Sequence, residues 1–401
     1  MHNPLTDWCD QIRAAAEQGR VLSVQGQGSK AFHGESPRGE PLSTVGWEGV
    51  LSYEPSELVV TVRSGTALSD LEALLAEQGQ CLPFEPPRFA GATATVGGMV
   101  ASGLAGPARA SVGGVRDYVL GAELINGRGE AVRFGGQVMK NVAGYDVSRA
   151  LAGSMGQLGL ITEVSLKVLP VPPAQSSFVV RMKQAAALDQ LQRWAGMPLP
   201  LNASSWAPAS SGTGQASADT SVASGEPTDD GYLIVRLRGA LAAVQAAIPV
   251  MQSHLSATGH SAMPLDESQA HAWWERCRDQ TDEFFTRPPA PDQALWRLSL
   301  PGTAPALALP SATLVEWHGA QRWCWAPASA ALALRALARE QGGHANLWRP
   351  SQAHPEVDRE VGVFMPLTPV QHRLQRALLA QFDPKGVFDT GRLGLDREPQ
   401  E

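Results

Sequence analysis

Hydrophobic residues recur along the first 170 positions with two periods, one typical of a helix and one typical of a strand. Leucines at positions 68, 71, 74 and 75 fall on one helical face, which predicts an amphipathic helix over residues 68–77. Residues 160–169 alternate apolar and polar side chains, as a half-buried strand does. The same patterns predict a helix over 8–17 capped by Thr6, strands at 21–25 and 58–62, and a hairpin of strands 119–125 and 131–134 around Asn126-Gly127-Arg128-Gly129.

A second group of elements follows three closely spaced prolines, Pro170, Pro172 and Pro173, which interrupt regular structure. Nine of the 11 tryptophans lie from Trp194 onward, so composition also changes here. We therefore predict one domain over residues 1–172 and an α+β domain with a small sheet over 173–401. Its predicted strands are 232–237, 295–300, 313–317 and 322–325, and its predicted helices are 241–255, 328–340 and 369–382. Residues 207–228 are almost all Ala, Ser, Gly, Thr and Pro, which predicts a flexible surface insertion.

Charge and cysteine content exclude several classes of protein. The net charge is −7 in 401 residues, which argues against broad nucleic-acid binding because that requires a basic face. The chain has no apolar run of about 18 residues, and its first residues lack the pattern of a signal peptide. Its 4 cysteines form no CxxC pair, so we expect neither a cysteine-held metal or iron–sulfur site nor a disulfide framework. A reduced, cytoplasmic setting fits best.

Glycine supplies the first candidate chemistry, because 16 of the 40 glycines lie between Gly91 and Gly159. Such a segment bends tightly or lies close to another group. A separate loop, Gln25-Gly26-Gln27-Gly28-Ser29-Lys30, follows a predicted strand, and its backbone N–H groups can bind a pyrophosphate. The loop is not a P-loop, and Ala31 stands where a dinucleotide motif needs its third glycine. An anion site and a simple turn both remain open for it.

Two further glycine motifs follow. Thr95 can cap a helix that begins with Gly97 and Gly98, which leaves N–H groups for a ligand; the alternative is a helix packed closely on a strand. The third motif joins Lys140-Asn141-Val142-Ala143-Gly144-Tyr145-Asp146 to Gly153-Ser154-Met155-Gly156-Gln157-Leu158-Gly159. Two of the five lysines, Lys30 and Lys140, fall in these glycine segments, which favours an anionic ligand.

In this order the three motifs resemble the FAD-binding domain of the vanillyl-alcohol oxidase (PCMH) flavoprotein family. Longer motifs narrow the resemblance to the smaller FAD-binding subunits of glycolate oxidase. These motifs are Glu85-Pro86-Pro87, Gly98-Met99-Val100-Ala101, Gly103-Leu104-Ala105-Gly106-Pro107, Val115-Arg116-Asp117, Phe134-Gly135-Gly136-Gln137-Val138-Met139-Lys140-Asn141-Val142-Ala143-Gly144-Tyr145-Asp146, Leu295-Trp296-Arg297-Leu298-Ser299-Leu300-Pro301, Gly342-Gly343-His344-Ala345 and Phe382-Asp383-Pro384-Lys385-Gly386-Val387-Phe388.

The resemblance implies a fold and a cofactor site. The fold is α+β: a PCMH-type FAD-binding domain of two α+β subdomains, then an α+β cap domain with a small antiparallel sheet, with segment 382–395 returning to the flavin. FAD is expected to bind non-covalently, because Ser29 stands where many relatives carry a linking histidine and His33 lies four residues too late. The residues implied to contact FAD are Gly26, Gln27, Gly28, Ser29, Lys30, Thr95, Gly97, Gly98, Ser102, Gly103, Gly113, Arg116, Asp117, Lys140, Asn141, Tyr145, Gly153, Ser154, Gly156, Gly159 and Ile161.

Oxidation of a 2-hydroxy acid needs a cation for the carboxylate and a base for the hydroxyl proton. Arg297 is the first candidate for the carboxylate, because its planar fork matches that group; an outward strand arginine is equally compatible with the sequence. His344 is the candidate base, against a structural histidine, and Arg392 is a third candidate facing flavin or substrate. Arg116 and Asp117 also fit a local ion pair that orders a turn. The nine histidines show no paired motif, so no metal site is expected.

The resemblance implies that glycolate is oxidised to glyoxylate, and that electrons leave through a larger FAD-binding subunit and an iron–sulfur subunit. A non-catalytic flavin-binding, electron-relay or structural subunit of the same complex is the alternative. A stand-alone sugar or polyol oxidase of the same fold is a third hypothesis. We expect no membrane span, and peripheral membrane association through the partner subunits stays open.

Overall fold

The computed structural model describes residues 4–89, 94–136, 147–209 and 230–397. Its contacts divide the chain into two compact units. Unit 1 comprises residues 1–105, 113–171 and 366–401, and unit 2 comprises residues 106–112 and 172–365. One division between the units lies at residues 171 and 172, beside the prolines at which a domain boundary is predicted. Two other segments do not follow that boundary. The C-terminal 366–401 groups with unit 1, and the short segment 106–112 groups with unit 2.

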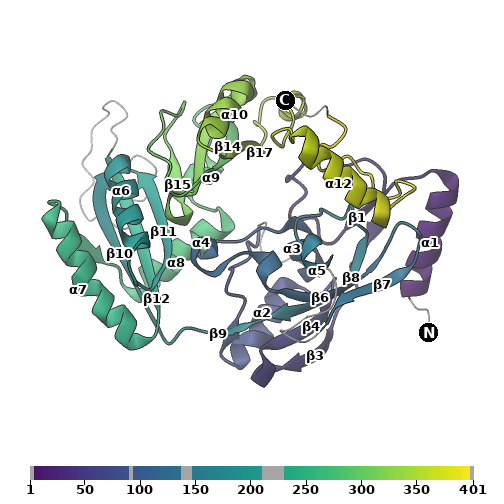
Figure 1. The fold of residues 1–401 in the computed structure, drawn as a ribbon, viewed down its shortest axis with the longest axis horizontal. Helices are drawn as coiled ribbons and strands as arrows, with labels where there is room; N and C mark the ends of the chain where they lie inside the picture. Colours follow the sequence, from purple (N-terminus) through teal and green to yellow (C-terminus); the bar gives the residue numbers. More distant parts are fainter. Residues whose placement is uncertain (1–3, 90–93, 137–146, 210–229, 398–401) are drawn as a thin grey trace. The chain divides into compact units, whose positions relative to one another are not determined.

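Unit 1 is built around a five-stranded antiparallel sheet with the strand order β3-β4-β8-β6-β7 (Figure 1). Its strands are β3 (Val50–Glu54), β4 (Val59–Arg63), β8 (Leu160–Lys167), β6 (Val119–Ile125) and β7 (Ala131–Gly135). The pairs β1 (Leu22–Gln25) with β2 (Glu40–Ser43), and β5 (Gln80–Cys81) with β9 (Leu169–Pro170), complete the strands. The predicted hairpin is confirmed, since β6 and β7 pair around Asn126, whose Oδ1 accepts from Arg128 N at 2.8 Å.

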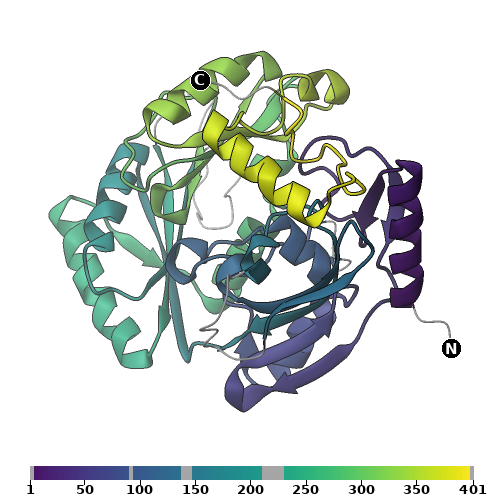
Figure 2. The same cartoon turned by 45° about the vertical axis from the view of Figure 1, so that its right-hand side comes forward.

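The helices of unit 1 are α1 (Pro4–Gln18), α2 (Leu68–Glu77), α3 (Val96–Ser102), α5 (Val147–Ala150) and α12 (Pro369–Phe382). The predicted bounds of α2 and α12 are confirmed. The Thr6 cap is wrong, because α1 begins before that residue. Trp8 and Ile12 of α1 pack in one buried cluster with Leu22, Val387 and Phe388 (α1 is purple in Figure 2). This cluster, together with a 2.7 Å hydrogen bond from Leu22 N to Val387 O, explains why the C-terminal segment belongs to unit 1.

Unit 2 contains an eight-stranded antiparallel sheet with the order β13-β10-β12-β11-β15-β16-β14-β17. The strands are β13 (Ala262–Pro264), β10 (Ala174–Lys183), β12 (Asp230–Gly239), β11 (Leu201–Pro208), β15 (Leu314–Glu316), β16 (Gln321–Ala326), β14 (Ala294–Ser299) and β17 (His344–Arg349). The helices are α4 (Arg109–Val112), α6 (Gln184–Ala195), α7 (Leu241–Ala257), α8 (Glu267–Asp279), α9 (Glu283–Thr286), α10 (Ala331–Glu340) and α11 (Pro355–Arg359).

The predicted α+β class with an antiparallel sheet is confirmed, but the sheet has eight strands and is larger than the small sheet we expect. Strand β10 starts directly after the proline cluster with the polar run Gln175-Ser176-Ser177, and β11 carries Asn202, Ser204 and Ser205. Neither stretch shows the alternation on which the prediction relied. The first two residues of the predicted insertion, Ala207 and Pro208, end strand β11, and residues 210–228 lie outside the described part.

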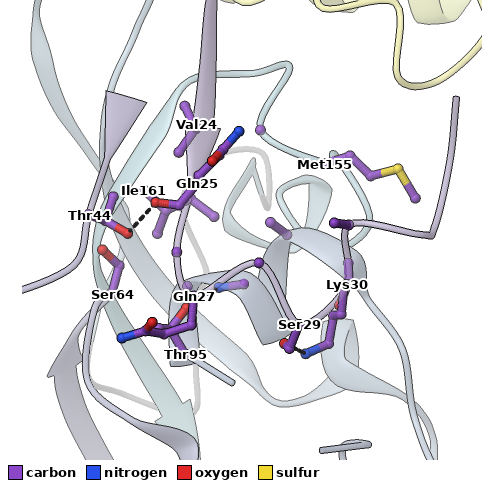
Figure 3. Close-up of a pocket in the computed structure, with 18 of the residues that line it drawn as sticks. Val24, Gln25, Gln27, Ser29, Lys30, Thr44, Ser64, Thr95, Met155 and Ile161 are labelled. Carbon is purple, nitrogen blue, oxygen red and sulfur yellow. Dashed lines mark hydrogen bonds between the residues drawn. The ribbon is translucent and has the colours of Figure 1, made fainter. Parts of the chain in front are cut away.

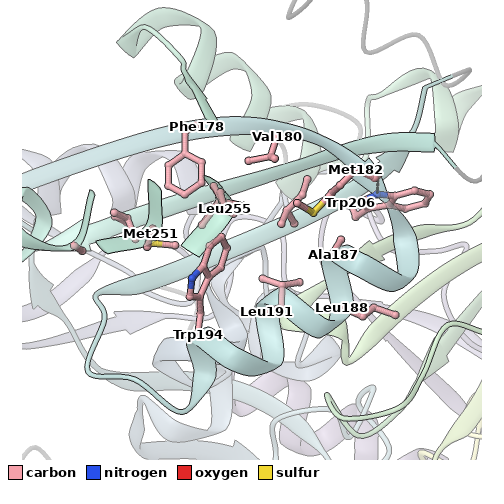
Figure 4. Close-up of a cluster of buried hydrophobic side chains, with 14 of the residues drawn as sticks. Phe178, Val180, Met182, Ala187, Leu188, Leu191, Trp194, Trp206, Met251 and Leu255 are labelled. Atoms are coloured by element: carbon pink, nitrogen blue, oxygen red, sulfur yellow. Dashed lines mark hydrogen bonds between the residues drawn. The ribbon is translucent and has the colours of Figure 1, made fainter. Parts of the chain in front are cut away.

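Two apolar clusters hold unit 2 together. Helices α6 and α7 pack on β10, β11 and β12, and Trp194 of α6 lies edge-on to Phe178 with ring centroids 6.3 Å apart (Figure 4). Helix α10 packs through Leu334 and Ala338 on Trp296 and Leu298 of β14 and on Leu347 of β17. The tryptophans at 273, 274, 323 and 325 are also buried. Among the described residues, no helix is long and apolar enough to cross a membrane.

A carboxyl group is buried within unit 2. Glu316 of β15 is 4% exposed, and its Oε2 accepts from Gln321 Nε2 at 2.9 Å and from Trp323 Nε1 at 2.6 Å. Burial raises the pKa of Glu316, and the two hydrogen bonds oppose that rise. The raised pKa means that ionisation of this carboxyl costs folding free energy.

The variant Glu316→Gln should flatten the pH dependence of the free energy of unfolding. The stability that a carboxyl with a raised folded pKa contributes is fully present below its unfolded pKa of about 4.3, and is lost as pH rises through the folded value. A glutamine oxygen keeps both acceptor roles and never ionises. Urea unfolding between about pH 4 and pH 8 measures the slopes, with exposed Glu340→Gln as the control. Identical slopes for wild type and Glu316→Gln would contradict the assignment.

Candidate functional site

Unit 1 contains an open cavity of about 1050 Å³, counting the solvent at its mouth, between the loop after β1, the start of α3 and the turn before β8 (Figure 3). In Figure 3, Thr44 and Ser64 lie on one side of the loop, and Met155 lies on the other. The lining residues of the cavity are Val24, Gln25, Gly26, Gln27, Gly28, Ser29, Lys30, Ala31, His33, Pro37, Thr44, Ser64, Thr95, Gly97, Gly98, Ala101, Ser102, Met155, Gly156, Gly159, Ile161 and Arg392.

The loop after β1 turns tightly because of its two glycines. Gly28 has φ +74°, a conformation that L side chains rarely adopt. A Cβ on Gly26 would lie 2.5 Å from Thr95 Oγ1, so the backbone approaches α3 where no side chain fits. The loop closes with a 2.9 Å hydrogen bond from Ala31 N to Gly28 O. All five predicted residues of the loop, Gly26 to Lys30, line the cavity.

Arg392 fixes this loop from the C-terminal segment. Its Nε donates to His33 O at 3.0 Å, and a terminal guanidinium nitrogen donates to Lys30 O at 2.7 Å and to His33 O at 2.9 Å. A planar fork that is bonded to several carbonyl oxygens holds the loop in one conformation. Arg392 lines the cavity, and its hydrogen bonds to the loop backbone assign it a positioning role there.

The start of α3 differs from the sequence prediction in one respect. Thr95 does cap the helix, since its side chain accepts from Gly98 N at 3.2 Å. The N–H groups of Val96 and Gly97 donate to Thr66 O at 3.0 Å and Ser64 O at 2.7 Å, so they are not available to a ligand. A Cβ on Gly97 would lie 2.7 Å from Ser64 Cβ. The glycine at this position therefore serves close packing on the chain after β4, which is the alternative that the sequence left open.

The glycine-rich turn before β8 divides its residues between two cavities. Met155 has φ +51° and lines the first cavity with Gly156, Gly159 and Ile161. Arg116, Gly153 and Ser154 line a second cavity of unit 1. Gly103, Gly113 and Asp117 line neither, and Lys140, Asn141 and Tyr145 lie outside the described residues. Asp117 Oδ2 accepts from Gly114 N at 2.8 Å, which orders the turn at which it stands.

Several lining residues, including Thr44, Ser64 and His33, are not among those that the sequence predicts. Ser64 is the informative case, because it is 1% exposed and its Oγ has no hydrogen-bond partner within the described residues. A buried hydroxyl without a partner costs free energy unless a ligand or water satisfies it. Its signal in the sequence is the Ser64-Gly65 pair directly after a buried strand, at the edge where the glycine motifs gather.

The remaining candidates, Arg297 and His344, lie on β14 and β17 of unit 2. The Arg297 guanidinium lies over the ring of Trp348, with Cζ 4.6 Å from the ring centroid. Burial and the charge of Arg109 lower the pKa of Arg297 to about 10, so it stays charged at neutral pH. Desolvation of the ring and the charge of Arg297 lower the pKa of His344. Its imidazole is therefore neutral at neutral pH.

The fold and cavity are those of a PCMH-type FAD-binding flavoprotein, and residues 6–135 match the FAD binding domain family. Over 384 residues the chain is 38% identical to glycolate oxidase subunit GlcE of Escherichia coli (strain K12), covering 96% of this chain and 95% of that protein. The chain belongs to this family of glycolate oxidase subunits.

Other similarities cover less of the chain or are more distant. The chain is 29% identical over 188 residues to glycolate oxidase subunit GlcD of Bacillus subtilis (strain 168), which is 46% of this chain and 40% of that protein. A solved structure of alkyldihydroxyacetonephosphate synthase superposes with a TM-score of 0.64 at 15% identity, covering 95% of this chain and 74% of that one. That likeness supports the fold alone.

The residues of the first cavity fit FAD. The buried Ser64 hydroxyl carries this fit, because a bound cofactor can supply the hydrogen-bond partner that it lacks among the described residues. Lys30 adds the cation that a pyrophosphate attracts. The residues that would hold the cofactor therefore come from the β1 loop, α3, the 155–159 turn and Ser64.

The variant Gly26→Ala should weaken FAD binding without unfolding the chain. The added Cβ collides with Thr95 Oγ1, so the loop or the α3 cap must shift, at a cost of about 1–3 kcal/mol, or roughly five- to hundredfold in affinity. Fluorescence titration of the apoprotein with FAD measures the affinity, and circular dichroism measures folding. Gly196→Ala is the matched control, because its nearest atom, Arg193 O, lies 3.7 Å from the built Cβ. Equal FAD affinities for Gly26→Ala and wild type would refute the close approach.

Proposed function

We propose that this chain is an FAD-dependent subunit of a glycolate oxidase complex and that it oxidises glycolate to glyoxylate. The observation that carries the proposal is the 38% identity to glycolate oxidase subunit GlcE along 96% of the chain. The FAD cavity of unit 1 supports the redox part. FAD is held non-covalently, since Ser29 supplies no ring nitrogen for a covalent link. The proposed partners are a larger FAD-binding subunit and an iron–sulfur subunit.

When bound, FAD accepts a hydride from the substrate carbon. The chain's own residues must bind the carboxylate and remove the hydroxyl proton. Arg297 suits the first task, because a guanidinium binds a carboxylate through two parallel hydrogen bonds. Its Nε is buried and has no hydrogen-bond partner among the described residues. A carboxylate that bound there would supply that partner.

His344 suits the second task. The side chain is on an exposed position of β17, and the strand register pairs it with Ser299, two residues from Arg297. The lowered pKa keeps the imidazole neutral, which is the form that accepts a proton. A carboxylate on Arg297 then presents its neighbouring hydroxyl to a base on the adjacent strand. Oxidation removes one proton and one hydride from glycolate, so the products balance as glyoxylate and reduced flavin.

The electrons are proposed to leave through the partner subunits. Among the described residues, no group of three or more His, Cys, Asp and Glu side chains gathers to hold a metal. Cys277 and Cys324 are buried, and burial raises the pKa of both thiols. Neither thiol is suited to redox chemistry, because the thiolate is the reactive form.

A non-catalytic flavin-binding or electron-relay subunit is the second candidate function. It is favoured by the hydrogen bonds of Arg392, whose guanidinium is bonded to the β1 loop backbone. Of the three candidates, Arg297 and His344 then remain to bind the carboxylate of the substrate and to remove its hydroxyl proton.

Anaerobic reduction separates the two functions. The purified FAD-loaded chain is mixed with glycolate, and the visible flavin absorbance is followed with and without the partner subunits. Bleaching in the isolated chain is expected for a catalytic subunit. A bound flavin that glycolate bleaches only when the partners are present would refute catalysis in this chain and support the relay. Acetate, which lacks the hydroxyl, is the control ligand.

Variants at Arg297 should separate its charge from its geometry. Flavin reduction by glycolate should slow as pH falls through the lowered pKa of His344, because the protonated imidazole accepts no proton. Arg297→Gln removes a charge that lowers this pKa, so the acid limb should move to higher pH. Arg297→Lys keeps the charge but loses the fork, so the limb should stay while the glycolate KM rises about tenfold. The pH profile of anaerobic reduction rates measures both, with exposed Arg287→Gln as control. One common acid limb in all variants would refute the role of His344.

A further inference from the structure

Trp348 stands at an irregular point of strand β17. In the pairing of β17 with β14, Leu347 lies opposite Trp296. The next paired residue of β17 is Arg349, opposite Leu295, so Trp348 is the extra residue of a β-bulge. A β-bulge re-aims a side chain, and bulges are common next to active sites. The contacts of the Trp348 ring show what this bulge serves.

One face of the Trp348 ring carries the Arg297 guanidinium, with Cζ 4.6 Å from the ring centroid. Within the described part of the chain, Arg297 makes no hydrogen bond and no ion pair, and its Nε is buried. A long side chain without a polar partner can turn about its bonds, so the stacking contact limits the plane of the guanidinium. Stacking occupies the face of the group and leaves its N–H edge, on which a carboxylate binds.

A second aromatic ring fixes Trp348 itself. The ring of Trp323 meets that of Trp348 at 69°, with the centroids 5.3 Å apart. Trp323 is buried, and its Nε1 donates to Glu316 Oε2 at 2.6 Å. Trp348 is 2% exposed. The guanidinium is therefore stacked on a ring that is packed on its other sides and held in one orientation.

The indole N–H of Trp348 is held by a residue in an unusual backbone conformation. Trp348 Nε1 donates to Gln280 Oε1 at 2.8 Å, and Arg349 Nη2 donates to the same oxygen at 2.9 Å. Gln280 ends helix α8 with φ +53° and ψ +44°, in the left-handed region where glycine or asparagine is usual. Other residues persist there when the surrounding structure fixes them, often at functional sites. Here the glutamine supplies an acceptor that glycine lacks.

We propose that Trp348 and Gln280 are positioning residues for Arg297, and that they fix the plane of its guanidinium for the carboxylate of a small 2-hydroxy or 2-oxo acid. This rests on the proposed function for the role of Arg297 and adds the two residues that set its geometry. A guanidinium that is already oriented loses less conformational entropy when a ligand binds, so affinity rises without a new contact to the ligand.

Calorimetric titration of the FAD-loaded chain with oxalate measures carboxylate binding without turnover, because oxalate has no hydrogen to transfer as hydride. Trp348→Leu removes the ring and should weaken oxalate binding about tenfold. Gln280→Met removes the acceptor and should weaken it roughly threefold. Gln280→Glu keeps an acceptor oxygen, and Arg349 neutralises the added charge, so this variant should bind as wild type.

Gln341→Met is the matched control. Gln341 ends helix α10 of the same unit with an ordinary φ of −88°, and its side chain makes no hydrogen bond within the described residues. Oxalate affinity should therefore stay at the wild-type value. FAD content, circular dichroism and urea unfolding check the folding of each variant. Trp348→Phe is a milder second variant, since it keeps a ring face and loses only the N–H, so its affinity should match that of Gln280→Met.

Arg297→Lys separates positioning from a general structural effect. Lysine keeps the positive charge but has no plane to orient. If Trp348 acts through the guanidinium plane, Trp348→Leu should cost less than about twofold further affinity in the Arg297→Lys background. An equal loss in both backgrounds would overturn the proposal. Wild-type oxalate affinity in Trp348→Leu, or in Arg297→Lys itself, would overturn it as well.

The two proposals fail in different ways. The expected pattern of oxalate affinities in a chain whose flavin is not bleached by glycolate would refute the proposed function and leave the positioning role standing. Bleaching by glycolate together with unchanged oxalate affinity in Trp348→Leu and Gln280→Met would do the reverse.

Discussion

The cofactor cavity depends on two places where the backbone of a glycine lies so close to a neighbouring residue that no side chain would fit at the glycine. At Gly26 the loop after β1 meets Thr95, and at Gly97 the first turn of α3 meets Ser64. Thr95 takes part twice, since it also caps α3 by accepting from Gly98 N. The loop, the helix start and the end of β4 therefore have one arrangement, with little room for adjustment. Arg392 adds a third constraint from the C-terminal segment, because it bonds the carbonyl oxygens on the far side of the same loop.

Unit 2 places an apolar cluster and a charged group on opposite faces of its sheet. Trp296 and Leu298 of β14 face the cluster beneath α10, whereas the alternate residue Arg297 lies on the opposite face with Trp348. Because successive side chains of a strand point to opposite faces of the sheet, the charged Arg297 and the core residue Trp296 can be neighbours in the sequence. Trp323 belongs to the charged face as well, where its ring contacts Trp348 and its Nε1 donates to Glu316. Aromatic side chains supply the apolar packing of this face, and the indole N–H of Trp323 also donates a hydrogen bond to the buried carboxyl of Glu316.

Local patterns predicted much of the secondary structure and part of the site. The helical period of the leucines gave the bounds of α2, and Asn126-Gly127 gave the β6–β7 hairpin, because both signals lie within a dozen neighbouring residues. The loop Gly26–Lys30 was identified for the same reason, and it lines the cavity. Strands β10 and β11 were missed, since polar residues within them, Ser177 in β10 and Asn202, Ser204 and Ser205 in β11, are buried only in the folded chain. Ser64 was missed because it lies beside Gly97 only in the folded chain, and the spacing of the two residues in the sequence does not predict this contact.

The sequence by itself determined where glycines gather along the chain, that its cysteines form no metal motif, and that it resembles FAD-binding glycolate oxidase subunits. Only the tertiary structure decided which glycines matter and why. It showed that the N–H groups of Val96 and Gly97 are bonded within the protein and that Arg392 holds the β1 loop. The physical reason is that glycine and turn residues act on their immediate neighbours. Burial, charge coupling and hydrogen-bond satisfaction depend instead on residues that folding brings together from distant parts of the chain.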